Sequence, residues 1–356
     1  MRASRSGSPP TRNTVPSPRS VTRDARPCLT DIAGRSTVIP QNAVVRPVPP
    51  VLPPAHGYRD DRATRRLLRS RPPTPALAWV ESALGGRITS VRPIRGGMSS
   101  AVHALGVELG SGATARVVLR RHVRAEVVDE EPEIAGREAA ILAFLGRVEL
   151  PTPLLLAVDP GGDQADVPSL LMSMLPGRVD WSPAGMDSWL RRLAEPLPIL
   201  HAMPLPPRGT LPAFFGYAQR SYEPPSWARW PEAWGRAVEI FHAPSRAEAT
   251  ACIHRDYHPG NVLWQAGRVT GIVDWPSASI GSPSIDVAHC RANLLGRFDI
   301  GVADRFTQRW EELTGRRFNP WADVMIIIGM LDGLRDDPHL NRASVEEALA
   351  RSVADL

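Results

Sequence analysis

The sequence predicts an α+β protein with two lobes, a small lobe built on a five-stranded antiparallel sheet and a larger lobe built mainly from helices. Before residue 175, short apolar strands alternate with glycine-containing turns, and one helix is inserted among them. After Leu175-Pro176-Gly177 the apolar residues recur at helical spacing instead. Strands followed by helices are typical of an α+β architecture. We therefore divide the chain into a tail at 1–75, a sheet lobe at 76–175 and a helical lobe at 176–356.

The tail at 1–75 is predicted to be disordered. It contains 14 prolines and 14 arginines but only four acidic residues, and its few large apolar residues show no periodicity. Such a segment cannot bury enough surface to offset the entropy lost on ordering. Because the whole chain carries a net charge of only +5, the lobes together are net acidic. A nucleic-acid-binding arm is the alternative for the tail, but nucleic-acid binding by the lobes is not expected.

The sheet lobe is expected to open with a short helix at 78–84, which Gly85-Gly86 would end. The inserted helix is expected at 133–145, with Ile141 and Leu142 on its apolar face. Gly110-Ser111-Gly112 is a tight-turn signal between two of the strands. The five strands are predicted at 88–94, 101–109, 115–120, 154–158 and 169–174.

The helical lobe is predicted from periodicity and from capping signals. Asn319-Pro320 would cap and start a buried helix that runs to residue 331. Ser344 with Glu347 has the spacing of a capping box for the last helix. Another helix, opened by Pro231, is indicated by four large side chains at helical spacing, Trp230, Trp234, Val238 and Phe241.

Composition excludes some classes of protein. The longest apolar runs, such as 324–328, are far shorter than the roughly 20 residues that cross a bilayer, so no membrane span is expected. The first ten residues lack the apolar core of a secretory signal. Cys28, Cys252 and Cys290 stand far apart, which favours a reducing cytoplasm. No His/Cys/Asp spacing suggests zinc.

One loop carries the residue types that phosphoryl transfer needs. This reaction requires a group that accepts the proton of the attacking hydroxyl and oxygen ligands that hold magnesium on the phosphates. Asp256 is the candidate base, and Asn261 offers an amide oxygen five residues later. A second short strand at 269–273 ends in Asp274, whose hard carboxylate suits magnesium. We expect Asn261 and Asp274 to be the metal ligands.

The same residues carry a family resemblance. Residues 254–261 read H-R-D-Y-H-P-G-N, which resembles the H-x-D-x-H-P-x-N loop of the aminoglycoside phosphotransferase and choline kinase-like family. That family shares the protein-kinase fold. The resemblance implies that Asp256 is the catalytic base, that His254 supports the catalytic loop by packing and hydrogen bonding, and that Asp286 braces the loop. The segment at 171–177 is similar to the family's hinge, so Met172 and Met174 are expected beside the purine.

The phosphate-binding side is the least similar part. Gly97 and Ser99 lie in a turn between the first two strands that could place backbone N–H groups and hydroxyls over the phosphates. All 42 basic residues are arginines, so no lysine can clamp the phosphates. The resemblance places Arg120 at that position, paired with Glu138 on the inserted helix. Arginine forks to phosphate oxygens well, although it does not replace lysine freely.

These observations predict a small-molecule kinase that uses ATP or GTP with Mg²⁺ and transfers the γ-phosphate to a hydroxyl group. An aminoglycoside or another amino alcohol is the expected acceptor, because the lobes are net acidic and Asp332, Asp336 and Asp337 cluster near the chain's end. It would lie against the helical lobe between residues 214 and 241 and after 299. A nucleotide-binding regulator with little catalytic activity is the alternative. A kinase acting on protein is disfavoured, because only a short segment separates Asp274 from Asp286.

Overall fold

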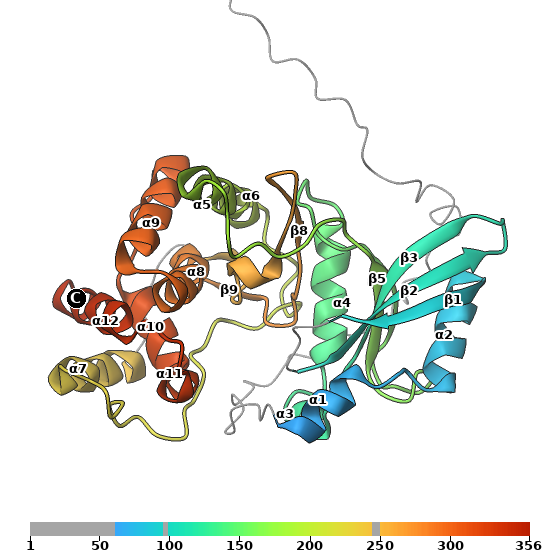
Figure 1. Cartoon of the computed structure of the whole chain (residues 1–356), viewed down its shortest axis with the longest axis horizontal. Coiled ribbons are helices and arrows are strands. Elements are labelled where there is room, and N and C mark those ends of the chain that lie inside the picture. The colour runs from blue at the N-terminus through green and yellow to red at the C-terminus, as the bar shows by residue number, and fades with distance from the viewer. Residues whose placement is uncertain (1–60, 95–98, 244–249) are drawn as a thin grey trace, which may run out of the picture. The chain divides into compact units, whose positions relative to one another are not determined.

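The computed structural model describes residues 61–94, 99–243 and 250–356, all of which belong to one compact unit (Figure 1). The prediction of disorder at 1–60 falls outside the described residues. For 61–75 it is wrong over most of the segment, because helix α1 spans Arg62–Arg69 and helix α2 starts at Thr74. Asp61 caps α1 by accepting a hydrogen bond from the backbone N–H of Thr64 at 2.8 Å. Leu68 is buried, so one apolar side chain anchors a segment of otherwise polar composition.

The predicted five-stranded antiparallel sheet is confirmed. Its order is β1-β2-β3-β5-β4, and every neighbouring pair is antiparallel. Before it lies α2 (Thr74–Leu84), which ends at Gly85 in the left-handed conformation that glycine adopts without strain. The strands are β1 (Gly86–Pro93), β2 (Ala101–Leu109), β3 (Thr114–Arg121), β4 (Leu155–Asp159) and β5 (Ser169–Ser173).

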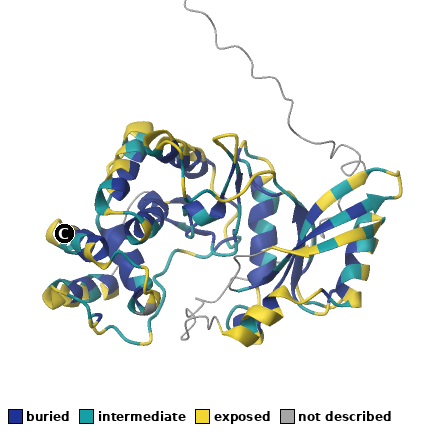
Figure 2. Cartoon of the chain, viewed as in Figure 1, coloured by how far each residue is buried: buried dark blue, intermediate teal, exposed yellow. Residues whose placement is uncertain are grey.

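Two helices lie between β3 and β4. The predicted inserted helix is α4 (Ile134–Leu145), and a short helix, α3 (Ala125–Glu130), precedes it without having been predicted. Ile141, Leu142 and Leu145 of α4 are buried in the core cluster that also contains the helical lobe's side chains, and Figure 2 shows α4 as largely buried. The inserted helix therefore shares a core cluster with β5 and the helical lobe, whereas α2 and the strands form a second, separate cluster.

The helical lobe contains the predicted helix beginning at Pro231, and Trp234 on it is fully buried. Asn319 accepts the backbone N–H of Trp321 at 3.0 Å, but Pro320 occupies the cap position and the helix ends at Gly329, two residues before the predicted end. The predicted capping box at Ser344 is wrong, because Ser344 lies inside the last helix and Asn341 caps it. The helices are α5 (Met186–Ala194), α6 (Pro196–Ala202), α7 (Pro231–His242), α8 (Pro283–Arg297), α9 (Ile300–Thr314), α10 (Trp321–Gly329), α11 (Leu331–Asp336) and α12 (Arg342–Ala354).

Between α7 and α8, two small antiparallel pairs position the loop that carries Asp256. Strand β6 (Ala251–Ile253) pairs with β9 (Ser279–Gly281), and β7 (Val262–Gln265) pairs with β8 (Arg268–Ile272). A single 3₁₀ turn, η1 (Pro259–Asn261), leads into β7. The predicted strand ending at Asp274 is thus β8. None of the helices in the described ranges is long and apolar enough to cross a bilayer.

Candidate active site

The backbone of the loop after β6 is held by one buried carboxylate. Asp286, in the first turn of α8, is fully buried. Its two oxygens accept the backbone N–H groups of His254 at 3.0 Å and Arg255 at 2.7 Å. His201 lies 2.9 Å from the same carboxylate through Nε2. A buried carboxylate with several donors is fixed in place, which is the geometry that the bracing role expected of Asp286 requires.

His254 links this loop to the strand end at Asp274. Its ring is fully buried, and Nδ1 accepts the backbone N–H of Asp256 at 3.3 Å. A neutral imidazole then carries its proton on Nε2, and Nε2 lies 3.0 Å from the carbonyl oxygen of Val273. Both hydrogen bonds of the His254 ring go to backbone atoms, so the side chain supports the loop.

Asp256 presents a partly exposed carboxylate. About a third of its side chain, 34%, is accessible. The side-chain amide of Asn261 donates to Asp256 Oδ2 at 3.0 Å and to its carbonyl oxygen at 2.9 Å. These bonds use the Nδ2 atom of Asn261, so its Oδ1 atom is left to act as an acceptor or a metal ligand.

Two histidines lie beside Asp256. His289 Nε2 is 3.3 Å from Asp256 Oδ1, and His258 Nε2 is 3.7 Å from the same oxygen. Burial lowers the pKa of both rings below the ordinary value, that of His289 to about 4. The sequence analysis did not single out His289. Its position three residues after Asp286 is a usable signal, because residues i and i+3 share one helix face.

Asp274 directly follows a residue whose backbone is hydrogen-bonded to Asn261. The backbone N–H of Val273 donates to the carbonyl oxygen of Asn261 at 2.9 Å, which joins the two segments directly before Asp274. Asp274 itself has a positive φ of 71°, so the chain turns sharply at the carboxylate. The described residues contain no group of three His, Cys, Asp or Glu side chains that could hold a metal. One carboxylate and one amide oxygen instead fit Mg²⁺, which usually takes one or two carboxylates plus phosphate oxygens.

Arg120, at the end of β3, lies between two carboxylates. Its Nη1 atom is 2.6 Å from Asp274 Oδ1 and 3.4 Å from Glu138 Oε1 on α4. The predicted contact with Glu138 is therefore present, and the closer contact with Asp274 was not predicted. Burial alone would lower the pKa of Arg120, but the two carboxylates raise it above its ordinary value. The side chain is a permanent cation.

The two carboxylates around Arg120 differ in charge. Burial raises the pKa of Glu138 to about 7, although the charge of Arg120 opposes the shift. Burial would also raise the pKa of Asp274, but the charge and hydrogen bond of Arg120 lower it below its ordinary value. Asp274 therefore keeps its negative charge near neutral pH, whereas Glu138 is close to half protonated.

The structure describes three of the four other residues that were predicted to bind the nucleotide. Gly97 lies outside the described residues, whereas Ser99 lies two residues before the start of β2. Met172 lies inside β5 and pairs in register with both neighbouring strands, so a contact with a purine would use its side chain. Met174 follows β5, and its backbone N–H donates to the carbonyl oxygen of Arg116 at 3.3 Å.

Comparisons with known proteins place the chain in a family. It matches the model of the phosphotransferase enzyme family over residues 90–321. No curated protein matches it. Among solved structures, a candidate aminoglycoside phosphotransferase from Ralstonia eutropha JMP134 is 17% identical with a TM-score of 0.53, covering 79% of this chain and 98% of its own.

Two further solved structures have the same fold. The aminoglycoside phosphotransferase APH(4)-Ia is 17% identical with a TM-score of 0.52 and covers 79% of this chain and 98% of its own. The complex of APH(2″)-IIa with streptomycin and ATP is 13% identical with a TM-score of 0.50, covering 74% and 90%. These likenesses show the fold, while the family model covers well over half of the sequence. The chain is therefore a phosphotransferase that belongs to the phosphotransferase enzyme family and has a two-lobed, protein-kinase-like fold.

Proposed function

We propose that this chain transfers the γ-phosphate of ATP or GTP to a hydroxyl group of a small molecule, with Asp256 as the catalytic base. The observation that carries the proposal is the setting of the Asp256 carboxylate. It is partly exposed, it contacts Asn261 and two uncharged histidines, and no arginine among the described residues forms an ion pair with it. Such a carboxylate can accept a hydrogen bond from an incoming hydroxyl.

The transfer step follows from this placement. The substrate oxygen forms a bond to the γ-phosphorus while the bond from that phosphorus to the β,γ-bridging oxygen breaks. The hydroxyl proton passes to a carboxylate oxygen of Asp256, and the nucleoside diphosphate leaves with the bond's electron pair. Asp256 orients the hydroxyl and accepts its proton, which contributes about 10²- to 10⁴-fold in other enzymes.

The metal would be held by Asn261 Oδ1 and the carboxylate of Asp274. When bound, Mg²⁺ neutralises phosphate charge. Asp274 suits this role because its carboxylate stays ionised and its side chain is 33% exposed. Asn261 is held in position by the bonds from its Nδ2 atom to Asp256.

The nucleotide would lie against Arg120, Ser99 and the hinge methionines. The Arg120 guanidinium is held by Glu138 and Asp274, and it retains further N–H groups that can donate to phosphate oxygens. Use of a nucleotide is supported by relatives of the same fold, since APH(4)-Ia has been solved with ADP and hygromycin B and with AMP-PNP and hygromycin B. Gly97 is proposed to contribute backbone N–H groups over the phosphates.

An aminoglycoside or another amino alcohol is the first acceptor to test, because the solved complexes of APH(4)-Ia and APH(2″)-IIa contain hygromycin B and streptomycin, respectively. The acidic cluster at the end of the chain supports this choice less than its sequence suggested. Asp332 is already engaged by Arg220 and Arg335, at 3.3 Å and 3.0 Å. Asp337 caps the backbone N–H of His339. A neutral polyol should therefore be included beside the cationic acceptors.

The test is a screen of aminoglycosides, amino alcohols and neutral polyols with γ-labelled ATP and GTP in the presence of Mg²⁺. Label should pass to at least one acceptor with the wild-type chain and not with Asp256→Asn. If no acceptor is labelled while the nucleotide binds tightly, the alternative of a nucleotide-binding regulator is favoured.

The buried, unpaired Cys252 and Cys290 suit a reducing compartment, and we propose a cytoplasmic location.

A further inference from the structure

We infer that His289 is a positioning residue of the phosphotransfer reaction: its Nε2 atom lies 3.3 Å from Oδ1 of Asp256 and can donate a hydrogen bond that fixes the orientation of the catalytic carboxylate. The inference rests on the proposed function, in which Asp256 is the base. It concerns a side chain that lies 33 positions after Asp256 and outside the loop motif at 254–261.

The contacts of the His289 ring determine which nitrogen carries the proton. Nε2 lies 3.3 Å from Asp256 Oδ1, whereas Nδ1 is buried and has no hydrogen-bond partner among the described residues. A neutral imidazole has one N–H group, and an ionised carboxylate can only accept. A proton on Nε2 therefore makes the one hydrogen bond available. Burial, which lowers the pKa of His289 to about 4, agrees with a neutral ring at pH 7.

His289 and Asn261 hold the carboxylate from two sides. Asn261 Nδ2 donates to Oδ2 of Asp256 at 3.0 Å, and His289 Nε2 faces Oδ1. The terminal torsion of aspartate is broad and roughly two-fold, so one donor on each oxygen restricts it. Each oxygen keeps a second acceptor site for the substrate hydroxyl. Because both donors are neutral, the carboxylate keeps its charge unpaired.

Helix α8 supplies two contacts to the same loop. Asp286 accepts the backbone N–H groups of His254 and Arg255, and His289, one turn later, faces the side chain of Asp256. Residues three apart lie on one helix face. One helix face therefore fixes both the loop's backbone and the reacting side chain.

His258 does not take this role in the geometry described. Its Nδ1 atom accepts the backbone N–H of Gly260 at 3.1 Å, so its Nε2 atom carries the proton. That atom is 3.7 Å from Asp256 Oδ1, which is beyond hydrogen-bond distance. His289 is the closer donor to this oxygen by 0.4 Å.

Two substitutions of His289 separate hydrogen bonding from packing. His289→Leu removes the N–H group, whereas His289→Gln keeps an N–H donor. We expect His289→Leu to lower kcat by about 10- to 100-fold, the scale of a misplaced reacting group, with little change in the KM for nucleotide. His289→Gln should retain kcat within about fivefold of wild type, since the donor is restored. The matched control is Cys290→Ala, which alters a buried neighbour on α8 and should leave kcat near wild type.

Two kinetic outcomes overturn the inference. One is a His289→Gln variant that is as slow as His289→Leu. The other is a His289→Leu variant whose kcat falls no further than that of Cys290→Ala. In either case His289 would only fill space beside the catalytic loop.

A second measurement needs no turnover. In the ¹⁵N spectrum of the histidine rings, the signals of His289 are identified by their loss in His289→Gln. They should report a proton on Nε2 and should shift in Asp256→Ala. A proton on Nδ1, or ring signals that do not respond to Asp256→Ala, would refute the hydrogen bond. If the wild-type chain transferred no phosphate, the proposed function would fail, and the spectrum would still decide whether the hydrogen bond exists.

Discussion

Helix α8 takes part in two polar clusters, each of which contains a carboxylate. The two carboxylates differ in their exposure and in the charge of their neighbours. Near the start of α8, Asp286 and His289 serve the loop of Asp256, whose carboxylate is partly exposed and has uncharged neighbours. Further along, Arg291 is buried and binds the carboxylate of Asp323 through Nε at 3.1 and 3.2 Å. The first carboxylate stays available to a ligand, and the second is fully enclosed.

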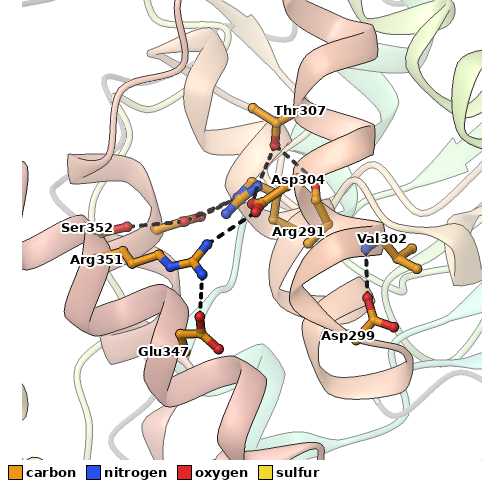
Figure 3. Close-up of polar contacts among 10 residues, drawn as sticks. Arg291, Asp299, Val302, Asp304, Thr307, Glu347, Arg351 and Ser352 are labelled. Carbon is orange, nitrogen blue, oxygen red and sulfur yellow. Dashed lines mark hydrogen bonds and ion pairs between the residues drawn. The ribbon is translucent and has the colours of Figure 1, made fainter.

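The enclosed cluster connects four helices. Arg291 also donates through Nη1 to Thr307 at 2.6 Å and to Asp304 at 3.1 Å, both on α9, and Arg351 of α12 contacts the other oxygen of Asp304 (Figure 3). Burial raises the pKa of Asp323 above its ordinary value, although the charge of Arg291 opposes the shift. A buried ion pair of this kind contributes little net stability, yet breaking it is costly. In the enclosed cluster, a charged arginine holds the carboxylate of Asp323 inside the helical lobe. Around Asp256, uncharged side chains contact the carboxylate and leave its charge unpaired.

The largest effect should follow removal of the reactive carboxylate. Asp256→Asn should lower phosphate transfer on the order of a thousandfold or more, because the amide cannot accept the hydroxyl proton. Binding of the nucleotide with Mg²⁺ and the melting temperature should stay near wild type. Asp274→Ala should instead lose the metal-dependent part of nucleotide binding. Equal losses of nucleotide binding in both variants, measured by titration calorimetry, would show that the two roles are assigned wrongly.

Asp323→Ala tests the opposite side of the comparison. It leaves Nε of the buried Arg291 without a carboxylate partner, although Nη1 keeps its contact with Asp304, so the free energy of unfolding should fall by about 3 kcal/mol. The kcat of the folded fraction should be unchanged. Replacing both members, as Arg291→Met with Asp323→Leu, should recover much of the stability. Urea denaturation gives the stability, and a loss of kcat comparable to that of Asp256→Asn would place Asp323 in the reaction.

Arg120 combines features of both clusters, because it is buried and paired but contacts the partly exposed carboxylate of Asp274. Arg120→Ala should slow transfer by on the order of a hundredfold or more, the scale of losing a charged clamp, whereas Arg120→Lys should retain substantial activity. Glu138→Ala should have a milder effect, since Asp274 still contacts Arg120. A double-mutant cycle should show clear coupling between Arg120 and Glu138. Wild-type transfer by Arg120→Ala would mean that another arginine binds the nucleotide.

His122, a buried histidine at the end of β3, makes the acid stability of the fold testable. Burial lowers its pKa from 6.5 to about 3. Between these two pH values, the unfolded chain binds a proton at His122 and the folded chain does not. The contribution of His122 to the free energy of unfolding is therefore fully present above pH 6.5 and is lost as the pH falls towards 3. His122→Leu should flatten the fall of melting temperature over this range. The exposed His339 gives the matched control, and His339→Leu should leave the curve unchanged.

The smallest effect concerns the cap of α12, the helix that brings Ser352 to Asp323. Asn341→Ala should cost about 1 kcal/mol, because Asn341 accepts the N–H of Ser344. Ser344→Ala should change stability by roughly 0.5 kcal/mol or less. Thermal unfolding of the two variants decides between them, and the reverse order would restore the capping box predicted from the sequence.

Local patterns were sufficient for the five strands and for α4 of the sheet lobe, but not for α3. Strand β2 begins and ends where its alternating residues predicted, and the turn at 110–112 joins it to β3. The loop of Asp256 could also be recognised from local sequence, because its motif residues lie within a few positions of one another. Helix α1 escaped prediction since its polar composition has only Leu68 to bury, and α3 is six residues long, too short for a periodic signal.

The α+β order of elements followed from local sequence patterns and is confirmed, whereas the role of Asp256 as the base stays a prediction. Tertiary structure alone decided which distant groups meet: Arg120 with Asp274, 154 positions apart, His289 with Asp256, and Arg291 with Asp323. The physical reason is that turns and periodic faces are set by residues a few positions apart, whereas ion pairs and hydrogen bonds require atoms within about 3–4 Å. The packing of the sheet, α4, α8 and α10 brings these side chains from separate segments that close.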